Sequence, residues 1–368
     1  IEFCHFMTDH ELNDITQKNI DNDTIAIGVS STFWDMGTIT RKISEPDWVV
    51  NARRIVEEKN PGIKWLLGGY GTDYPDLQFN WVKFNGFAED SILKWIDENN
   101  SKLIYREPFD ITKSFKTFSK DDLIQPNETL SVELARGCQF KCKFCSFPLI
   151  GKRKGTYTRD FGLIREEFIR NYNEWGTTKY YFLDDTVNES EEKIQALADI
   201  VQSLPFELSW VGYNRLDLIY SRPNTIQLLK DSGLKSTHFG IESFQPLASM
   251  AIGKGWYGKH GKEFLLELKD KWKNDVSWMM SFIVGLPGDT PENIEDTNQW
   301  CIDNEMPAWC FFGLYINNSP KKLWKSEFDL NYEQYGYSFP NKQTPFKWEN
   351  DLWTYESSQA FAAKMTED

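Results

Sequence analysis

Strand-like and helix-like segments alternate along most of this 368-residue chain, and that alternation limits its fold more than any other feature. Between residues 129 and 314, six short apolar runs of strand type are separated by segments whose apolar residues have helical spacing. The expected strands cover residues 130–134, 179–183, 208–212, 237–241, 278–284 and 309–314. Six successive strand–helix units predict an α/β fold with a partial (β/α)6 barrel, whose sites lie at the carboxyl ends of the strands.

The first hundred residues show the same alternation over a shorter length. Strand-like runs occur at 24–30, 63–67 and 81–84, with helices expected from Asp47 to Asn60 and from Glu89 to Glu98. Short turns between such elements predict a separate doubly wound parallel sheet over residues 1–100. A polar linker is expected over 101–128, the barrel over 129–314, and an aromatic-rich carboxyl-terminal extension over 315–368.

Charge and cysteine use narrow the class of protein. The net charge of −14 argues against a grip on the phosphate backbone, so nucleic acid is not an expected partner. No apolar run has the roughly 20 residues needed to span a membrane, and the first residues do not form a secretory leader. Three of the six cysteines lie within eight residues, unlike a secreted disulfide framework. We therefore expect a reduced, cytoplasmic protein.

The clustered cysteines are Cys138, Cys142 and Cys145, with the spacing CxxxCxxC directly after the first barrel strand. Three thiolates on one loop can hold a 4Fe–4S cluster that normally takes four ligands, which leaves one iron open. The alternative is a zinc knuckle, which needs four ligands. No fourth cysteine or histidine lies nearby, since the closest histidine in the sequence is His238.

An aromatic residue precedes the third cysteine, in Cys142-Lys-Phe144-Cys145. This motif resembles the hallmark of the radical S-adenosylmethionine (SAM) superfamily. The resemblance implies that SAM chelates the open iron and is cleaved reductively to a 5′-deoxyadenosyl radical, which abstracts hydrogen from a substrate. It also implies that Phe144 lies beside SAM.

The resemblance extends over residues 129–314 and implies further SAM contacts. Asp184 and Asp185 follow the second strand, where the family has a Gly-Gly-Glu-like motif that binds the SAM amino group. The glycines are absent here, so either aspartate could make this contact, or the pair could belong to the start of the helix near Ser190. After the fourth strand, Glu242 resembles the residue that contacts the ribose, with a salt-bridged surface glutamate as the alternative.

The third and fifth strands supply the remaining candidates. Ile283, Val284 and Gly285 resemble the strand end whose backbone contacts adenine in this superfamily, and a glycine there permits close approach. Asn214 and Arg215 follow the third strand and either face the SAM pocket or have a structural role.

The amino-terminal segment resembles the cobalamin-binding domain that precedes many radical SAM cores. By this resemblance Ser30 or Ser31 and the turn Gly68–Gly69 would approach the cofactor. The Asp-x-His-x-x-Gly motif that supplies an axial histidine is absent, and the first strand of such a domain is not visible, so we expect a truncated domain. A cobalamin site and a vestigial domain that binds nothing are both compatible with these residues.

Three functions remain open at this point. The leading hypothesis is a radical SAM enzyme acting on an unidentified small molecule or peptide, by rearrangement or cyclisation if no cobalamin binds. The alternative within this class is a cobalamin-dependent radical C-methyltransferase. A methylthiotransferase would need three more cysteines in the first domain, which has only Cys4. Outside the enzymes, the chain could be an iron–sulfur or zinc binding module.

A reductive enzyme also needs an electron donor. A short basic stretch stands out on the acidic chain and is either a landing site for an acidic flavodoxin or ferredoxin or a solvated loop. Its members are Lys141, Lys143, Lys152, Arg153 and Lys154. Cys310, on the sixth strand, could point into the barrel.

Overall fold

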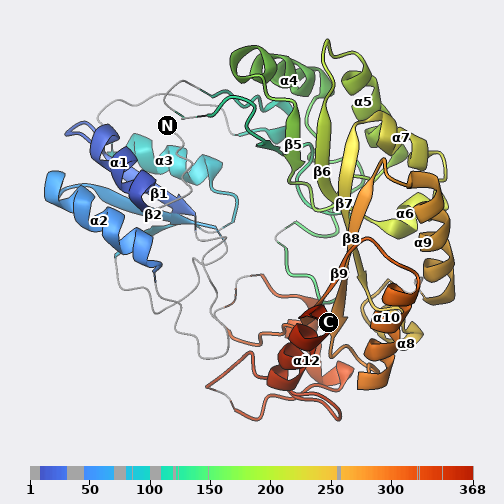
Figure 1. Ribbon diagram of the computed structural model, residues 1–368. Helices are drawn as coiled ribbons and strands as arrows, with labels where there is room; N and C mark the ends of the chain where they lie inside the picture. The colour runs from blue at the N-terminus through green and yellow to red at the C-terminus, as the bar shows by residue number, and fades with distance from the viewer. Residues whose placement is uncertain are drawn as a thin grey trace. The chain divides into compact units, whose positions relative to one another are not determined.

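Figure 1 shows a computed structural model of the chain. It describes residues 9–30, 45–69, 80–84, 86–99, 109–118, 122, 124–147, 149–254, 258–320, 322, 324–341 and 343–367. These residues divide into two compact units, the first up to Asp110 together with those of 117–124, and the second with 111–116 and from Gln125 onward.

The first unit is a three-stranded parallel sheet in the order β1-β2-β3, as the alternation predicts. Its strands are β1 (Ala26–Ser30), β2 (Lys64–Gly68) and β3 (Val82–Lys83), and its helices are α1 (Asp9–Asn19), α2 (Asp47–Lys59) and α3 (Glu89–Asn99). Its core is built from Val49, Val56, Ile63, Trp65, Leu67 and Trp81. Helix α1 has no counterpart among the expected elements.

The second unit contains a six-stranded sheet, parallel throughout and in sequence order. The strands are β4 (Leu130–Val132), β5 (Lys179–Phe182), β6 (Ser209–Asn214), β7 (Leu234–Glu242), β8 (Ser277–Val284) and β9 (Trp309–Gly313). All six expected strands are present, with ends that differ by one to three residues. The prediction of a parallel α/β barrel core is confirmed.

Helices cover one face of this sheet, on the outside of its curve in Figure 1. They are α4 (Phe161–Trp175), α5 (Glu191–Gln202), α6 (Leu216–Ser221), α7 (Thr225–Asp231), α8 (Pro246–Ala251), α9 (Gly258–Trp272) and α10 (Pro291–Asp303). Phe168 of α4 packs on Tyr180 and Phe182, and Trp272 of α9 stacks on Phe239. Because side chains alternate between the faces of a strand, the neighbours of these buried aromatic residues point to the inner face.

Local signals explain where the helices begin and end. The Asp160 carboxylate caps α4 by accepting from the Leu163 N–H, and Gly176 ends that helix in the left-handed conformation. Ser190 caps α5 in the same way by accepting from the Lys193 N–H.

The carboxyl-terminal segment has more structure than its sequence indicates. It contains α11 (Glu327–Asn331) and α12 (Tyr355–Glu367), and α12 packs along β9 and β8. The aromatic side chains of Tyr337, Trp348 and Trp353 are buried. In the described part of the chain, no helix combines the length and apolar character that a membrane crossing requires.

Candidate active site

The three clustered cysteines lie on the loop that follows β4, the first strand of the second unit. Cys138, Cys142 and Cys145 are partly buried free thiols, and Phe144 on the same loop is half-buried. Backbone hydrogen bonds hold this loop from both sides. The Cys138 N–H donates to the Leu149 carbonyl (2.9 Å), and the Lys143 N–H donates to the Ile252 carbonyl (3.0 Å).

The surroundings of these thiols suit a metal cluster. Burial, and then the charge of the other thiolates, raises the pKa of Cys145 to about 12, and burial also raises the pKa of Cys138. Iron would supply the positive charge that stabilises these buried thiolates. Polar groups also reach the sulfurs, since Thr186 Oγ1 lies 3.3 Å from Cys138 Sγ and Arg215 Nη1 donates to Cys142 Sγ (3.4 Å).

The arrangement fits a cluster better than a single zinc ion. Among the described residues, no three histidine, cysteine, aspartate or glutamate side chains converge as ligands of one metal ion do. In an iron–sulfur cube each thiolate binds a different iron, so the three sulfurs stand farther apart than around one zinc.

Asp184 is a structural residue of the cluster loop. It is buried, and its carboxylate accepts from the N–H groups of Leu134 (2.7 Å) and Ala135 (2.9 Å) at the start of that loop. Lys193 on α5 forms a buried ion pair with the same Asp184 carboxylate, at 2.6 Å. Both Asp184 oxygens are therefore engaged within the chain.

Asp185, the next residue, has a different environment. It is half-buried, and burial together with the charges of Asp184 and Glu133 raises its pKa to about 6. Its charge in turn raises the pKa of Cys145, so it stands close to the cluster ligands. Its carboxylate has no hydrogen-bond partner in the described residues. Asp185 can therefore accept a hydrogen bond from a ligand ammonium group.

Arg215 follows β6 in the sequence, but its side chain contacts the cysteine loop after β4. Its guanidinium stacks on the Phe140 ring, 3.9 Å from the centroid, and donates two hydrogen bonds to Asp217 (3.0 and 2.8 Å). The preceding Asn214 is buried and donates to Thr237 Oγ1 (2.9 Å), while its Oδ1 has no partner among the described groups.

Glu242 stands at the carboxyl end of β7 in a strained conformation. Its φ of 67° lies in the left-handed region, next to a β-bulge in the pairing of β7 with β8. Lys254 holds its carboxylate at 2.8 Å and also donates to the Gly240 carbonyl (2.7 Å). Such strain is often found at functional sites.

At the end of β8, the chain itself contacts the backbone of Gly285. Ile283 is half-buried and Val284 is fully buried, whereas Gly285 (φ 96°) is covered by the carboxyl-terminal segment. The Gly285 carbonyl accepts from the Tyr337 hydroxyl (2.8 Å), and its N–H donates to the Asp289 carboxylate. Both polar groups of the Gly285 backbone are thus used within the chain.

Sequence reasoning did not identify Asp289. It is buried, it also accepts from the Leu286 N–H (3.0 Å), and burial raises its pKa to about 7. The only available signal was its place directly after the Leu286-Pro287-Gly288 turn, where a carboxylate can bind free N–H groups.

The cobalamin candidates lie at one edge of the first sheet. Ser30 and Gly68 are register partners at the carboxyl ends of β1 and β2, and Gly69 has a φ of 87°. Among the described residues, a side chain added at Gly68 would meet nothing within 4 Å. Ser31 lies outside the described residues.

The structure removes Lys152 from the basic stretch as an exposed surface, whereas Lys141, Arg153 and Lys154 are exposed. Lys152 is buried, forms an ion pair with Glu189 (3.3 Å) and donates to the Thr156 carbonyl. Lys154 pairs with Glu192 at 3.2 Å. A salt bridge neutralises both cations, so they contribute little to attracting an acidic partner.

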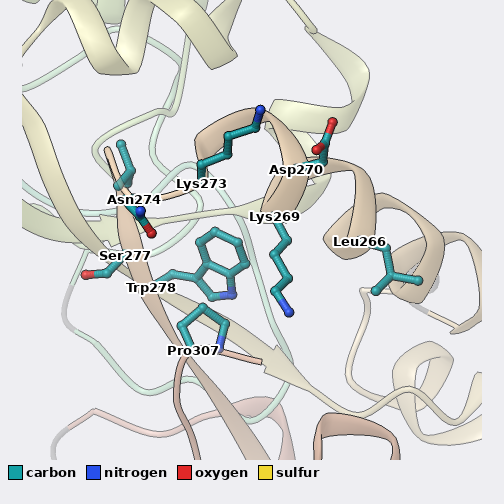
Figure 2. A pocket seen from close by; sticks show the side chains of 9 residues that line it. Leu266, Lys269, Asp270, Lys273, Asn274, Ser277, Trp278 and Pro307 are labelled. Carbon is teal, nitrogen blue, oxygen red and sulfur yellow. The ribbon is translucent and has the colours of Figure 1, made fainter. Parts of the chain in front are cut away.

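A cavity of about 670 Å³ lies away from these residues (Figure 2). The side chains that line it include Lys269 of α9, Lys273 directly after that helix, Trp278 and Pro307. Trp278 is at the amino end of β8, whereas barrels of this type carry their chemistry at the carboxyl ends. The cavity is therefore not the candidate active site.

Residues 132–301 match the family model of the radical SAM superfamily. This segment is a radical SAM domain. It includes the cysteine loop, the two aspartates after β5, Arg215, Glu242 and the end of β8. The match confirms the predicted superfamily.

Curated and solved relatives agree with this assignment. The chain is 30% identical over 167 residues to "Uncharacterized methyltransferase PH0819" of Pyrococcus horikoshii. This match covers 45% of the chain and 35% of that protein. The chain thus spans about a third of this relative's length. The radical SAM methyltransferase TsrM from Kitasatospora setae, solved with cobalamin and a [4Fe–4S] cluster, has a TM-score of 0.61 at 14% identity, over 92% of this chain and 73% of TsrM. The cobalamin-dependent enzyme OxsB has a TM-score of 0.57 at 12% identity, over 80% and 45%. Such low identities show the fold alone.

Proposed function

We propose that the chain is a radical SAM enzyme. Cys138, Cys142 and Cys145 would hold a 4Fe–4S cluster with one iron open to the amino and carboxylate groups of SAM. When bound, the cluster supplies the electron that splits SAM into methionine and a 5′-deoxyadenosyl radical, which takes hydrogen from the substrate. The observation that carries this proposal is the loop of three free thiols inside the radical SAM domain, held by Asp184.

The side chains around the loop then divide the work of binding SAM. Asp185, rather than Asp184, would accept hydrogen bonds from the SAM ammonium, and Glu242 would accept from the ribose hydroxyls. Phe144 and Ile283 would offer apolar contact. Arg215 would act on the cluster through Cys142 Sγ, since hydrogen bonds to the sulfurs affect the reduction potential of a cluster.

Anaerobic reconstitution tests this proposal. The full chain, loaded with iron and sulfide and reduced with dithionite, should release 5′-deoxyadenosine from SAM. Cys142→Ala should abolish release while its circular dichroism spectrum stays that of the wild type, and Cys301→Ala, a buried cysteine outside the loop, should keep it. No release from wild-type protein with an intact cluster would refute the proposal.

Cobalamin-dependent methyl transfer is the second candidate, favoured by the parallel sheet of the first unit, in which Ser30 and Gly68 are register partners at the strand ends. TsrM and OxsB, whose structures contain cobalamin, share this fold, and PH0819 is named a methyltransferase. Protein purified with hydroxocobalamin should then show a bound cobalamin spectrum. Cys142→Ala should retain that spectrum because the two sites are on different units. A spectrum without cobalamin would leave rearrangement or cyclisation as the reaction class.

The remaining partners follow from the chemistry. We propose a small-molecule or peptide substrate and an electron donor such as a flavodoxin or ferredoxin, which does not use Lys152 for docking. The cytoplasm, where thiols stay reduced, is the compartment that suits these cysteines.

A further inference from the structure

Five hydrogen-bonding side chains form a row across one face of the β5–β9 sheet, here called the inner-face row. Its members are Tyr181, Tyr213, His238, Ser281 and Cys310, one from each strand. Tyr213 pairs in register with His238, and Ser281 pairs with Cys310. Tyr181 pairs with Val211, which is two residues before Tyr213. His238 pairs with Met279, which is two residues before Ser281. Register partners and residues two apart share a face, so all five side chains point the same way.

This is the face that the helices leave uncovered. The intervening residues Tyr180, Phe182 and Phe239 carry the packing of α4 and α9 on the opposite face. The row also lies close to the chemistry, because Tyr213 is two residues before Arg215, whose guanidinium contacts Cys142 Sγ. Two residues of strand span about 7 Å.

The members of the row contact one another. The rings of Tyr213 and His238 lie 5.1 Å apart, and those of Tyr181 and Tyr213 meet edge to face at 6.4 Å. His238 Nε2 lies 2.9 Å from Ser281 Oγ. This contact fixes the orientation of the imidazole, so its other nitrogen keeps a defined position.

His238 Nδ1 is a polar atom of the row that can meet a ligand. It has no hydrogen-bond partner in the described part of the chain. Burial lowers the pKa of His238, more than the charge of Glu242 raises it, so the ring is neutral at neutral pH. When Nε2 donates to Ser281, Nδ1 is left as an acceptor.

Large apolar side chains lie exposed beside these polar groups. Leu183 is 51% exposed, Tyr213 41% and Phe312 55%. Leu183 is two residues after Tyr181 and Phe312 two after Cys310, so both point to the inner face toward the strands' carboxyl ends. Exposed aromatic faces of this kind favour stacking with a planar ring.

We propose that the inner-face row binds the substrate, and that this substrate is an uncharged aromatic molecule whose O–H or N–H donates to His238 Nδ1. The proposal rests on the proposed radical SAM function and adds the substrate class and its contact residue. No member of the row carries a formal charge. The charges that act on His238, those of Glu242 and Lys254, are paired with each other at 2.8 Å, which disfavours a charged ring because neither is left to compensate its desolvation. Tyr213, whose ring lies 5.1 Å from that of His238, would stack on the substrate ring, and Ser281 would orient His238.

Three small probes separate these elements in the reconstituted full chain, by NMR saturation-transfer titration. Phenol carries the ring and the donor, anisole has the donor methylated, and benzoate carries a charge. Wild-type protein should bind phenol about five-fold more tightly than anisole, the effect of one hydrogen bond, and should bind benzoate most weakly. His238→Leu should remove the preference for phenol, and His238→Gln, which restores an acceptor, should recover part of it.

His260→Leu is the matched control, because His260 is exposed on α9 and should leave the preference intact. Equal binding of phenol and anisole by the wild type, tighter binding of benzoate, or an unchanged preference in His238→Leu would each overturn the proposal. If His238→Leu does not fold, Ser281→Ala should lower the preference by releasing the imidazole, and an unchanged ratio would count against the row.

These titrations do not depend on SAM cleavage. Release of 5′-deoxyadenosine by the wild type without a phenol preference would refute only the substrate class. Absence of release from an intact cluster would refute the proposed function, whatever the probes show.

Discussion

The loop after β4 and the turn after β8 lie at the same edge of one sheet, yet they use their polar groups differently. In the cysteine loop, Asp184 binds the backbone and leaves three thiols and Asp185 available. In the turn after β8, Asp289 and Tyr337 bind both polar groups of the Gly285 backbone. A buried carboxylate holds each segment, but the first also leaves a second carboxylate, that of Asp185, without a hydrogen-bond partner among the described residues. A motif at a strand end therefore indicates a site only if the rest of the chain leaves it free.

The largest effect is expected from Asp184→Ala. The change leaves Lys193 buried without its ion-pair partner, and it removes the acceptor of the N–H groups of Leu134 and Ala135. We expect the free energy of unfolding in urea to fall by about 3–5 kcal/mol and cluster loading to be lost. Glu192→Ala, which removes a carboxylate from an exposed ion pair on α5, the helix that carries Lys193, should lower the free energy of unfolding far less. Equal costs for both variants would contradict the role given to Asp184.

Asp185→Asn should separate ligand binding from stability. Loss of the charged acceptor should raise the KM for SAM about 10-fold or more, the effect of a hydrogen bond to a charged group. The fold should not weaken, because burial already disfavours the Asp185 charge and raises its pKa to about 6. Steady-state kinetics of 5′-deoxyadenosine release measures the change. An unchanged KM would mean that the two aspartates do not divide their roles as described.

Asp289→Asn tests the turn after β8 through pH. Because the pKa of Asp289 is raised to about 7, its contribution to the free energy of unfolding is fully present below about pH 4, the pKa of an ordinary aspartate. That contribution is lost as the pH rises through about 7, because the buried group must then ionise. We expect the wild type to lose a few kcal/mol relative to Asp289→Asn between pH 5 and 8. Asp275→Asn, at an exposed site, should show no such trend over that range.

Tyr337→Phe should have the smallest effect. It removes one hydrogen bond to the Gly285 carbonyl and should lower the free energy of unfolding by about 1 kcal/mol. In Tyr335→Phe, the control, the hydroxyl that is lost has no hydrogen bond in the described residues. A gain in SAM affinity in Tyr337→Phe would show that Gly285 and the ligand compete for this bond, and the contrast between the two segments would then weaken.

Much of the fold was predictable from the sequence because the signals are local. The period of apolar residues, Gly176 after α4 and the cap at Asp160 each act over a few residues. The carboxyl-terminal segment was not predictable in this way. Its buried tyrosine and tryptophans donate hydrogen bonds to residues that follow β8 and β9. These residues are distant in the sequence, so no local period indicates the contacts.

The sequence by itself determined the parallel strand–helix core and the three cysteines with their missing fourth ligand. Both depend on spacing along a few residues. Only the tertiary structure decided between Asp184 and Asp185, because adjacent side chains of the same chemistry differ solely in what packs around them. The same is true of Gly285, engaged by a tyrosine 52 residues later, and of His238. Its strand neighbours form a site because parallel strands bring distant residues into register on one face.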